Sequence, residues 1–169
     1  MPYRTARYGK AVTVDVHVER VVDAPATRVW EVVTDLDSAP AVISGIDHVE
    51  RLDDATSFGV GTTWRETRTM FGKQVTEQME VTQVDPPHRY TVVAINGSTT
   101  YTSVVAVTPI DEHRCHLTMT MAARSSSLVT RLLAATLGRL FLRATRSALQ
   151  RDVDDIAACS TDRPTPGIA

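Results

Sequence analysis

The chain has few cysteines, few aromatic residues and no long apolar run. Among 169 residues only Cys115 and Cys159 carry thiols, and their spacing fits neither a CxxC pair nor a zinc site. A disulfide framework is therefore not expected, which is typical of a reducing compartment. No segment approaches the roughly 20 apolar residues of a membrane span, and the N-terminus lacks the apolar core of a signal peptide. We expect a cytoplasmic protein with no integral membrane segment.

Neither sign of charge predominates, since the net charge of the chain is −2. Without a basic field, nucleic acid is not an expected partner. The five histidines show no HExxH spacing, and Gly59-Val60-Gly61 lacks the lysine and the strand-to-helix context of a phosphate loop. Ser125 to Ser127 lack the flanking glycines of a hydrolase nucleophile. We expect neither a metal nor a cofactor.

The patterns that are present predict one α+β domain over residues 12–158, between a flexible N-terminus (1–11) and a disordered tail (159–169). Apolar and polar residues alternate from Val12 to Val18, which predicts a half-buried strand. A short helix ending near Thr34 and a second helical piece over 35–42, interrupted by Pro40, follow. A brief strand near 49–52 precedes five longer ones, and one helix closes the domain. The ranges of these last elements are 62–70, 73–84, 89–96, 98–108, 114–123 and 126–158.

Turn signals fix which side chains of these strands share a face. Asn96-Gly97 is a strong hairpin dipeptide, and the turns at 71–72, 85–88 and 109–113 give the same assignment of inside and outside. A one-residue shift would move every side chain to the other face, so the register specifies the inward set. That set comprises Trp64, Met70, Val75, Met79, Val81, Tyr90, Val92, Ala94, Asn96, Tyr101, Ser103, Val105, Val107, Cys115, Leu117, Met119 and Met121.

The same register places charges on the face that should be apolar. Glu66 and Glu77 are predicted opposite or next to each other, with Arg68 one step along and Asn96 beside Glu77. Paired carboxylates suit acid/base chemistry because one pKa is raised, whereas a neighbouring arginine opposes that shift. Three interpretations stay open for this cluster: a structural role, as an internal ion-pair network or as charges near a water-filled cavity mouth; ligand recognition; and acid/base catalysis.

The terminal helix is predicted to cover the apolar face of a curved antiparallel sheet, since no other element is long enough. One stripe of this helix contains Leu133, Leu137, Leu140, Phe141, Ala144 and Ala148, and a second contains Arg131, Arg139, Arg143 and Arg146. A sheet that wraps a helix without filling the space encloses a cavity. The arginine stripe is interpreted as a solvated face, with a homodimer interface and membrane-surface binding as alternatives.

Three segments resemble the START/polyketide-cyclase-like superfamily, whose helix-grip fold is shared with birch-pollen-allergen relatives. They are Val21-Val22-Asp23-Ala24-Pro25-Ala26-Thr27-Arg28-Val29-Trp30, Gly59-Val60-Gly61-Thr62-Thr63-Trp64-Arg65-Glu66 and Asp85-Pro86-Pro87-His88-Arg89-Tyr90. The resemblance covers residues 12–158 and implies about seven strands around the terminal helix, with a cavity for a hydrophobic small molecule. Its members include lipid carriers, polyketide cyclases or dehydratases and hormone receptors, and they share no catalytic set.

Three functions follow as hypotheses. The first is a protein that binds a lipid, polyketide or aromatic molecule between sheet and helix. The second is a polyketide cyclase or dehydratase that moves protons with Glu66, Glu77 or Tyr101, and the third is an interaction protein with a filled cavity. The predicted ligand-binding residues are Trp64, Glu66, Arg68, Glu77, Met79, Tyr90, Asn96, Tyr101, Ser103, Met119, Met121, Leu133, Leu137 and Phe141, whereas no catalytic residue is assigned.

Overall fold

A computed structural model describes residues 12–70, 72–125 and 128–162 of the chain. Within these ranges the predicted order of one strand, two short helices, six strands and one long helix is confirmed. The elements are β1 (Val12–Val22), α1 (Ala26–Thr34), α2 (Ala39–Val42), β2 (His48–Arg51), β3 (Thr63–Met70), β4 (Lys73–Asp85), β5 (Arg89–Asn96), β6 (Thr99–Pro109), β7 (Cys115–Ser125) and α3 (Leu128–Asp162).

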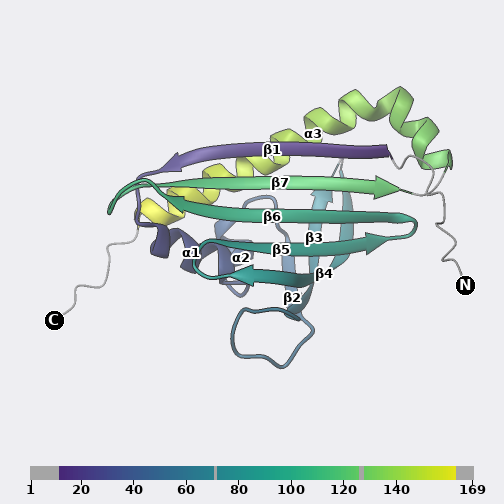
Figure 1. Cartoon of the computed structure of the whole chain (residues 1–169). Helices are drawn as coiled ribbons and strands as arrows, with labels where there is room; N and C mark the ends of the chain where they lie inside the picture. Colours follow the sequence, from purple (N-terminus) through teal and green to yellow (C-terminus); the bar gives the residue numbers. More distant parts are fainter. Residues whose placement is uncertain (1–11, 71, 126–127, 163–169) are drawn as a thin grey trace, which may run out of the picture.

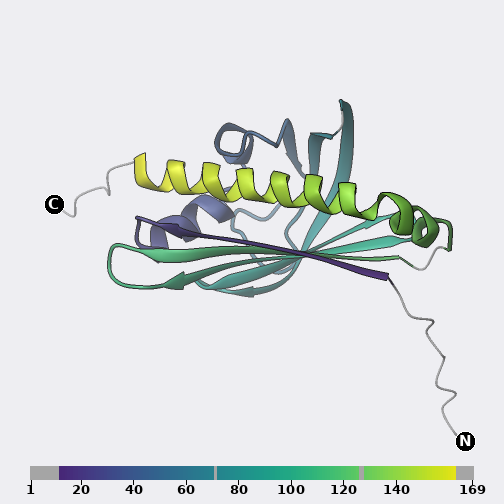
Figure 2. The same ribbon diagram turned by 90° about the horizontal axis from the view of Figure 1, so that it is seen from above.

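The seven strands form one antiparallel sheet in the order β1-β7-β6-β5-β4-β3-β2. Each neighbour in space is therefore a neighbour in sequence, except that β1 pairs with β7. The sheet curves, and α3 runs along its concave side (Figure 1). Seen from above, β3 and β4 rise on the same side as α3, so the sheet wraps around the helix (Figure 2). This is the helix-grip arrangement.

The predicted register of the hairpins is confirmed. Glu66 pairs with Glu77 across β3 and β4, and Ser103 pairs with Met121 across β6 and β7. Gly72 and Gly97 have φ values of 74° and 58°, a backbone region that glycine enters without the strain a Cβ would cause. One irregularity was not predicted: the register of β4 shifts between Val81 and Gln83. The bulge transfers the inward position from Val81 to Val84 and bends the strand.

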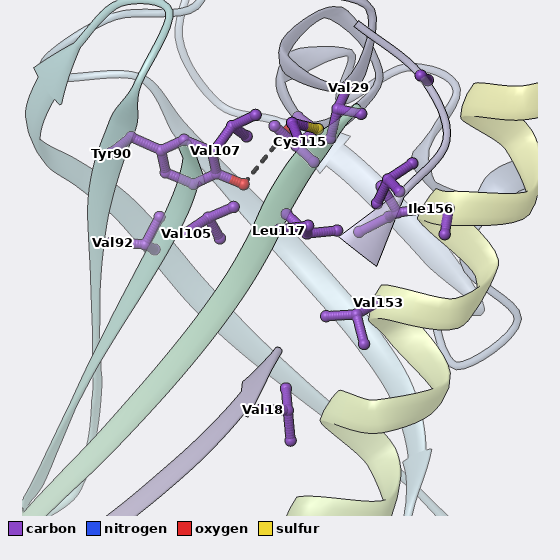
Figure 3. Packing of buried hydrophobic residues seen from close by; sticks show 14 of the residues in the cluster. Val18, Val29, Tyr90, Val92, Val105, Val107, Cys115, Leu117, Val153 and Ile156 are labelled. Carbon is purple, nitrogen blue, oxygen red and sulfur yellow. Dashed lines mark hydrogen bonds between the residues drawn. The ribbon is translucent and has the colours of Figure 1, made fainter. Parts of the chain in front are cut away.

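The core lies where the second half of α3 meets one end of the sheet. Val153 and Ile156 of α3 point towards Leu117 of β7 and Val18 of β1 (Figure 3), and all four are nearly inaccessible to solvent. Val29 of α1 closes the same cluster. Burying such an aliphatic side chain contributes about 2 kcal/mol to the stability of the fold. This end of the molecule is therefore the main source of hydrophobic stabilisation.

Two prolines lie at the N-terminal ends of the short helices. Pro25 is the N-cap residue of α1. Pro40 lies in the first turn of α2 and not in its interior, where its missing N–H costs no helical hydrogen bond. The prediction that Pro40 interrupts a helix over 35–42 was therefore wrong, because the helix begins only at Ala39.

The terminal helix differs from its prediction in its length and in which of its sides is buried. It extends to Asp162, so residues 159–162 of the predicted tail are helical, whereas 163–169 lie outside the described residues. Leu140 is 62% exposed and Phe141 37% exposed, so the predicted inner stripe does not cover the sheet there. The buried stripe instead contains Thr145, Asp152, Val153, Ile156 and Ala157. Of the helices in the described ranges, none has the length and apolarity to cross a membrane.

Candidate ligand-binding site

The inward charges of β3 form a buried network with α3. Arg68 donates from Nε to Glu66 Oε1 at 2.6 Å and from Nη1 to Asp152, whose Oδ2 lies 2.9 Å away. Trp64 Nε1 donates to the second oxygen of Glu66 at 3.2 Å. The side chains of Arg68, Glu66 and Asp152 are 26%, 11% and 2% exposed. The arginine thus ties the curled edge of the sheet to the helix that the sheet surrounds.

Asp152 is the member of this network that sequence reasoning missed. Its place beside Val153 and four residues before Ile156 puts it on the apolar side of α3. A second signal was available: an inward arginine on β3 needs a carboxylate from the element that covers it, because buried charges are paired. Both signals indicate Asp152, which was assigned no role because the apolar stripe was placed on a different side of the helix.

Burial and pairing act in opposite directions on these groups. Burial raises the pKa of the Asp152 carboxyl, and the Arg68 guanidinium opposes this only in part. For Arg68, burial lowers the pKa, but the Glu66 and Asp152 carboxylates outweigh it and the pKa is raised. Gly45 in the α2–β2 loop packs closely against the pair, since a Cβ there would lie 3.1 Å from Arg68 Nη1.

A second, separate polar group surrounds Glu77. Asn96 Nδ2 on β5 donates to Glu77 Oε1 at 3.1 Å, as the predicted neighbourhood of these two residues requires. Among the ion pairs of the described residues, none includes Glu77. Burial raises the pKa of the Tyr101 hydroxyl, and the negative charge of Glu77 raises it further. Tyr101 is therefore a neutral phenol at physiological pH.

Tyr90 belongs to the packed core. Its hydroxyl donates to the Val33 carbonyl at 3.0 Å, and its ring meets Trp30 and Phe58 edge to face. Burial, followed by the charge of Glu66, raises the pKa of this hydroxyl. With its one donor used inside the protein, Tyr90 braces α1 against the sheet.

The concave face of the sheet is not uniformly covered. At the end near α1, inward residues such as Val107 and Cys115 are buried. In the middle of the face six inward side chains stay partly exposed although they face the side on which α3 lies, whereas Ala123 and Ser125, nearer the β5–β6 turn, are buried again. We call this set the half-buried patch; it consists of Glu77, Met79, Tyr101, Ser103, Met119 and Met121.

One buried polar atom on α3 has no partner. Thr145 is 4% exposed, and its hydroxyl makes no hydrogen bond. It lies seven residues before Asp152, hence two turns away on the same side of the helix. Buried hydroxyls are nearly always satisfied, by water or a ligand if not by protein.

The sequence matches the family model described as polyketide cyclase/dehydrase and lipid transport over residues 13–158. The chain belongs to this family. No match was found among the curated protein sequences. Membership of the polyketide cyclase/dehydrase and lipid transport family supports a role in ligand binding or cyclisation. The solved structures described next support the fold.

Solved structures of the same fold include two enzymes with full-length correspondence. The aromatase/cyclase ZhuI from Streptomyces sp. R1128 is 16% identical with a TM-score of 0.77, covering 93% of this chain and 100% of that one. Truncated norcoclaurine synthase from Thalictrum flavum is 20% identical with a TM-score of 0.72, covering 94% and 100%. The di-domain aromatase/cyclase StfQ of the steffimycin biosynthetic pathway is 14% identical with a TM-score of 0.74, covering 89% and 52%. At these identities the likeness shows the fold alone.

The predicted site residues of this family member therefore fall into five groups. Trp64, Glu66 and Arg68 form the network with Asp152. Tyr90 lies in the core, Phe141 is 37% exposed, and the side chains of Leu133 and Leu137 lie outside the described residues. The remaining seven either form the half-buried patch or, for Asn96, border it. In the described parts of the chain no three His, Cys, Asp or Glu side chains are grouped as metal ligands would be.

Proposed function

We propose that the protein binds a hydrophobic small molecule on the half-buried patch, between the sheet and the first half of α3. The observation that supports this most is the uneven burial of one sheet face: the end near α1 is sealed, whereas the middle of the face keeps methionine, tyrosine and serine side chains partly exposed. Apolar pockets with a few placed polar groups are typical of ligand sites. Methionine side chains adapt to ligands of different shape.

The hydroxyl of Thr145 supports the same proposal from the helix side. An orphan buried hydroxyl costs about 1 to 3 kcal/mol unless something hydrogen-bonds to it. A ligand or an ordered water between α3 and the sheet removes that cost. The family description, which includes lipid transport and cyclisation, agrees with a small apolar ligand.

Dye binding with a matched pair of variants tests the proposal. Ser103 points into the patch, whereas Thr102, the preceding residue of β6, faces the opposite side of the sheet. We expect wild-type protein to bind the neutral dye Nile red, Ser103→Trp to weaken binding at least about tenfold by filling the patch, and Thr102→Trp to leave it unchanged. Circular dichroism checks that both variants fold, and Ser103→Leu, which adds less volume, replaces Ser103→Trp if that variant does not.

Absence of dye binding to the wild-type protein, or equal effects of the two substitutions, would contradict the proposal. Native mass spectrometry of protein purified from its own host then identifies the retained molecule by its mass. A ligand that is lost in Ser103→Trp and kept in Thr102→Trp is assigned to the patch.

An enzyme of the cyclase or dehydratase type is the second candidate function. The feature that favours it is Tyr101, a neutral phenol beside the Glu77 carboxylate, because such a pair can donate and accept protons near one bound molecule. Glu66 suits this role less, since Arg68 and Trp64 occupy both of its oxygens. A ligand recovered with altered mass, and conversion lost in Tyr101→Phe while binding is kept, would favour the enzyme over the carrier.

A further inference from the structure

The charges that the structure describes on the concave face of the sheet are unbalanced. Glu66, Glu77 and Asp152 face one guanidinium, that of Arg68, and this guanidinium already donates to Glu66 and Asp152. The network therefore has no free cation to offer a ligand. Even with Asp152 neutral, the charge of Glu77 remains in excess.

Glu77, a member of the half-buried patch, has one carboxylate oxygen uncommitted. The Asn96 amide donates to Oε1, and no hydrogen bond of the described residues reaches Oε2. The nearest inward cation along β4 is Lys73, which is exposed at the β3–β4 turn and lies four residues, or about 13 Å, along the strand. At that separation water and salt screen most of its field.

The geometry points to a selective ligand site, and this inference rests on the proposed binding function. We infer that the patch accepts apolar molecules whose polar head is a hydrogen-bond donor, either an alcohol or phenol hydroxyl or a protonated amine, and rejects apolar carboxylates. A hydroxyl or ammonium group can donate to Glu77 Oε2. A carboxylate would instead meet a like charge, with no unpaired counter-ion among the described side chains of the sheet, which costs several times the thermal energy in a partly buried site.

Three naphthalene derivatives with the same ring system and different head groups test the selectivity. At neutral pH 2-naphthol is uncharged, 2-naphthylmethylamine is a cation and 2-naphthoate is an anion. Their affinities are measured by displacement of Nile red from the wild-type protein. We expect 2-naphthoate to bind at least about tenfold more weakly than 2-naphthol, and the difference to shrink as salt is raised. The inference requires that 2-naphthol bind better than the carboxylate, and the affinity of the amine relative to the phenol shows which of the two donor chemistries the site prefers.

Glu77→Gln tests whether this carboxylate is the cause. The variant keeps the shape and the hydrogen-bonding oxygen but loses the charge, so the gap between 2-naphthoate and 2-naphthol should narrow to about threefold or less. Glu80→Gln is the matched control, because Glu80 lies on the same strand, exposed on the outer face. It should leave the gap unchanged.

The possible results distinguish this inference from the proposed function. If 2-naphthoate binds as tightly as 2-naphthol to the wild-type protein, or if Glu77→Gln leaves the gap intact, selection by Glu77 is refuted while ligand binding stands. If neither the dye nor any of the three compounds binds, the proposed function fails and the inference fails with it.

Discussion

Replacing Arg68 with methionine should destabilise the protein far more than an ordinary loss of a surface charge. Methionine keeps most of the apolar stem, so the change removes mainly the guanidinium. The carboxylates of Glu66 and Asp152, which are 11% and 2% exposed, then remain without a counter-ion. The expected effect is therefore that of breaking a buried ion pair.

The size of the effect follows from the burial of the partners. Removing one member of a buried pair costs about 3 to 5 kcal/mol. Because Arg68 itself is 26% exposed, water can partly solvate the site in the variant, and we expect the lower end, about 3 kcal/mol. Urea unfolding followed by tryptophan fluorescence measures the change in the free energy of unfolding.

Arg65→Met is the matched control on the same strand. Arg65 pairs with Glu50 on the outer face at 3.1 Å, and both side chains are about half exposed. Such surface pairs contribute less than about 1 kcal/mol. Equal losses in the two variants would refute the view that the Arg68 network is a buried electrostatic unit.

The pH dependence separates charge from packing. Burial raises the pKa of Asp152 above 3.8 in the folded protein, so its contribution to stability is present below the unfolded pKa and is lost as pH rises through the folded pKa. Without Arg68 this pKa rises further, so the variant should lose more stability, relative to wild type, at about pH 8 than at about pH 5. A loss that does not change with pH would indicate that packing, and not the unpaired carboxylates, is responsible.

Three further predictions concern stability, each measured by urea unfolding. Gly45→Ala should cost about 1 to 2 kcal/mol by overpacking, because its Cβ would lie 3.1 Å from Arg68 Nη1. Gly59→Ala should be neutral or slightly stabilising, because a Cβ there would meet no atom within 4 Å. Equal effects of the two substitutions would contradict the close contact at Gly45. Tyr90→Phe should cost about 1 to 2 kcal/mol by orphaning a buried carbonyl; no loss would mean that water replaces the phenol. Leu117→Ala should cost about 3 to 4 kcal/mol, because Leu117 is fully buried. Ile95→Ala should change the free energy of unfolding by no more than about 0.5 kcal/mol, because Ile95 is 70% exposed. Similar losses in the two variants would refute the assigned core.

The strands and their faces could be predicted because their signals are local. Alternation fixes which side chains share a face, and dipeptides such as Asn96-Gly97 fix the turns. The opposition of Glu66 and Glu77 followed from the hairpin register alone. The bulge after Val81 was not predictable in this way, since no glycine or proline marks it in the sequence.

The parts that failed depend on contacts between distant segments. The inner face of α3 was misplaced because leucines occur around much of its first half, so the apolar pattern does not single out one stripe. Only packing against the sheet determines which side of α3 is buried, and the residues that it buries include Val153 and Ile156. The partner of Arg68 was missed for the same reason, as it lies 84 positions away on that helix.

The pairing of β1 with β7 sets the order in which the molecule can be completed. His17 and Thr120, which are partners in this pairing, lie 103 positions apart. At typical rates of synthesis of about 5 to 20 residues per second, β1 waits on the order of 5 to 20 seconds for its neighbour. During that time its row of valines has no sheet to join. Such distant pairing also makes folding slow, so the first strand is the segment of the nascent chain most in need of protection from aggregation.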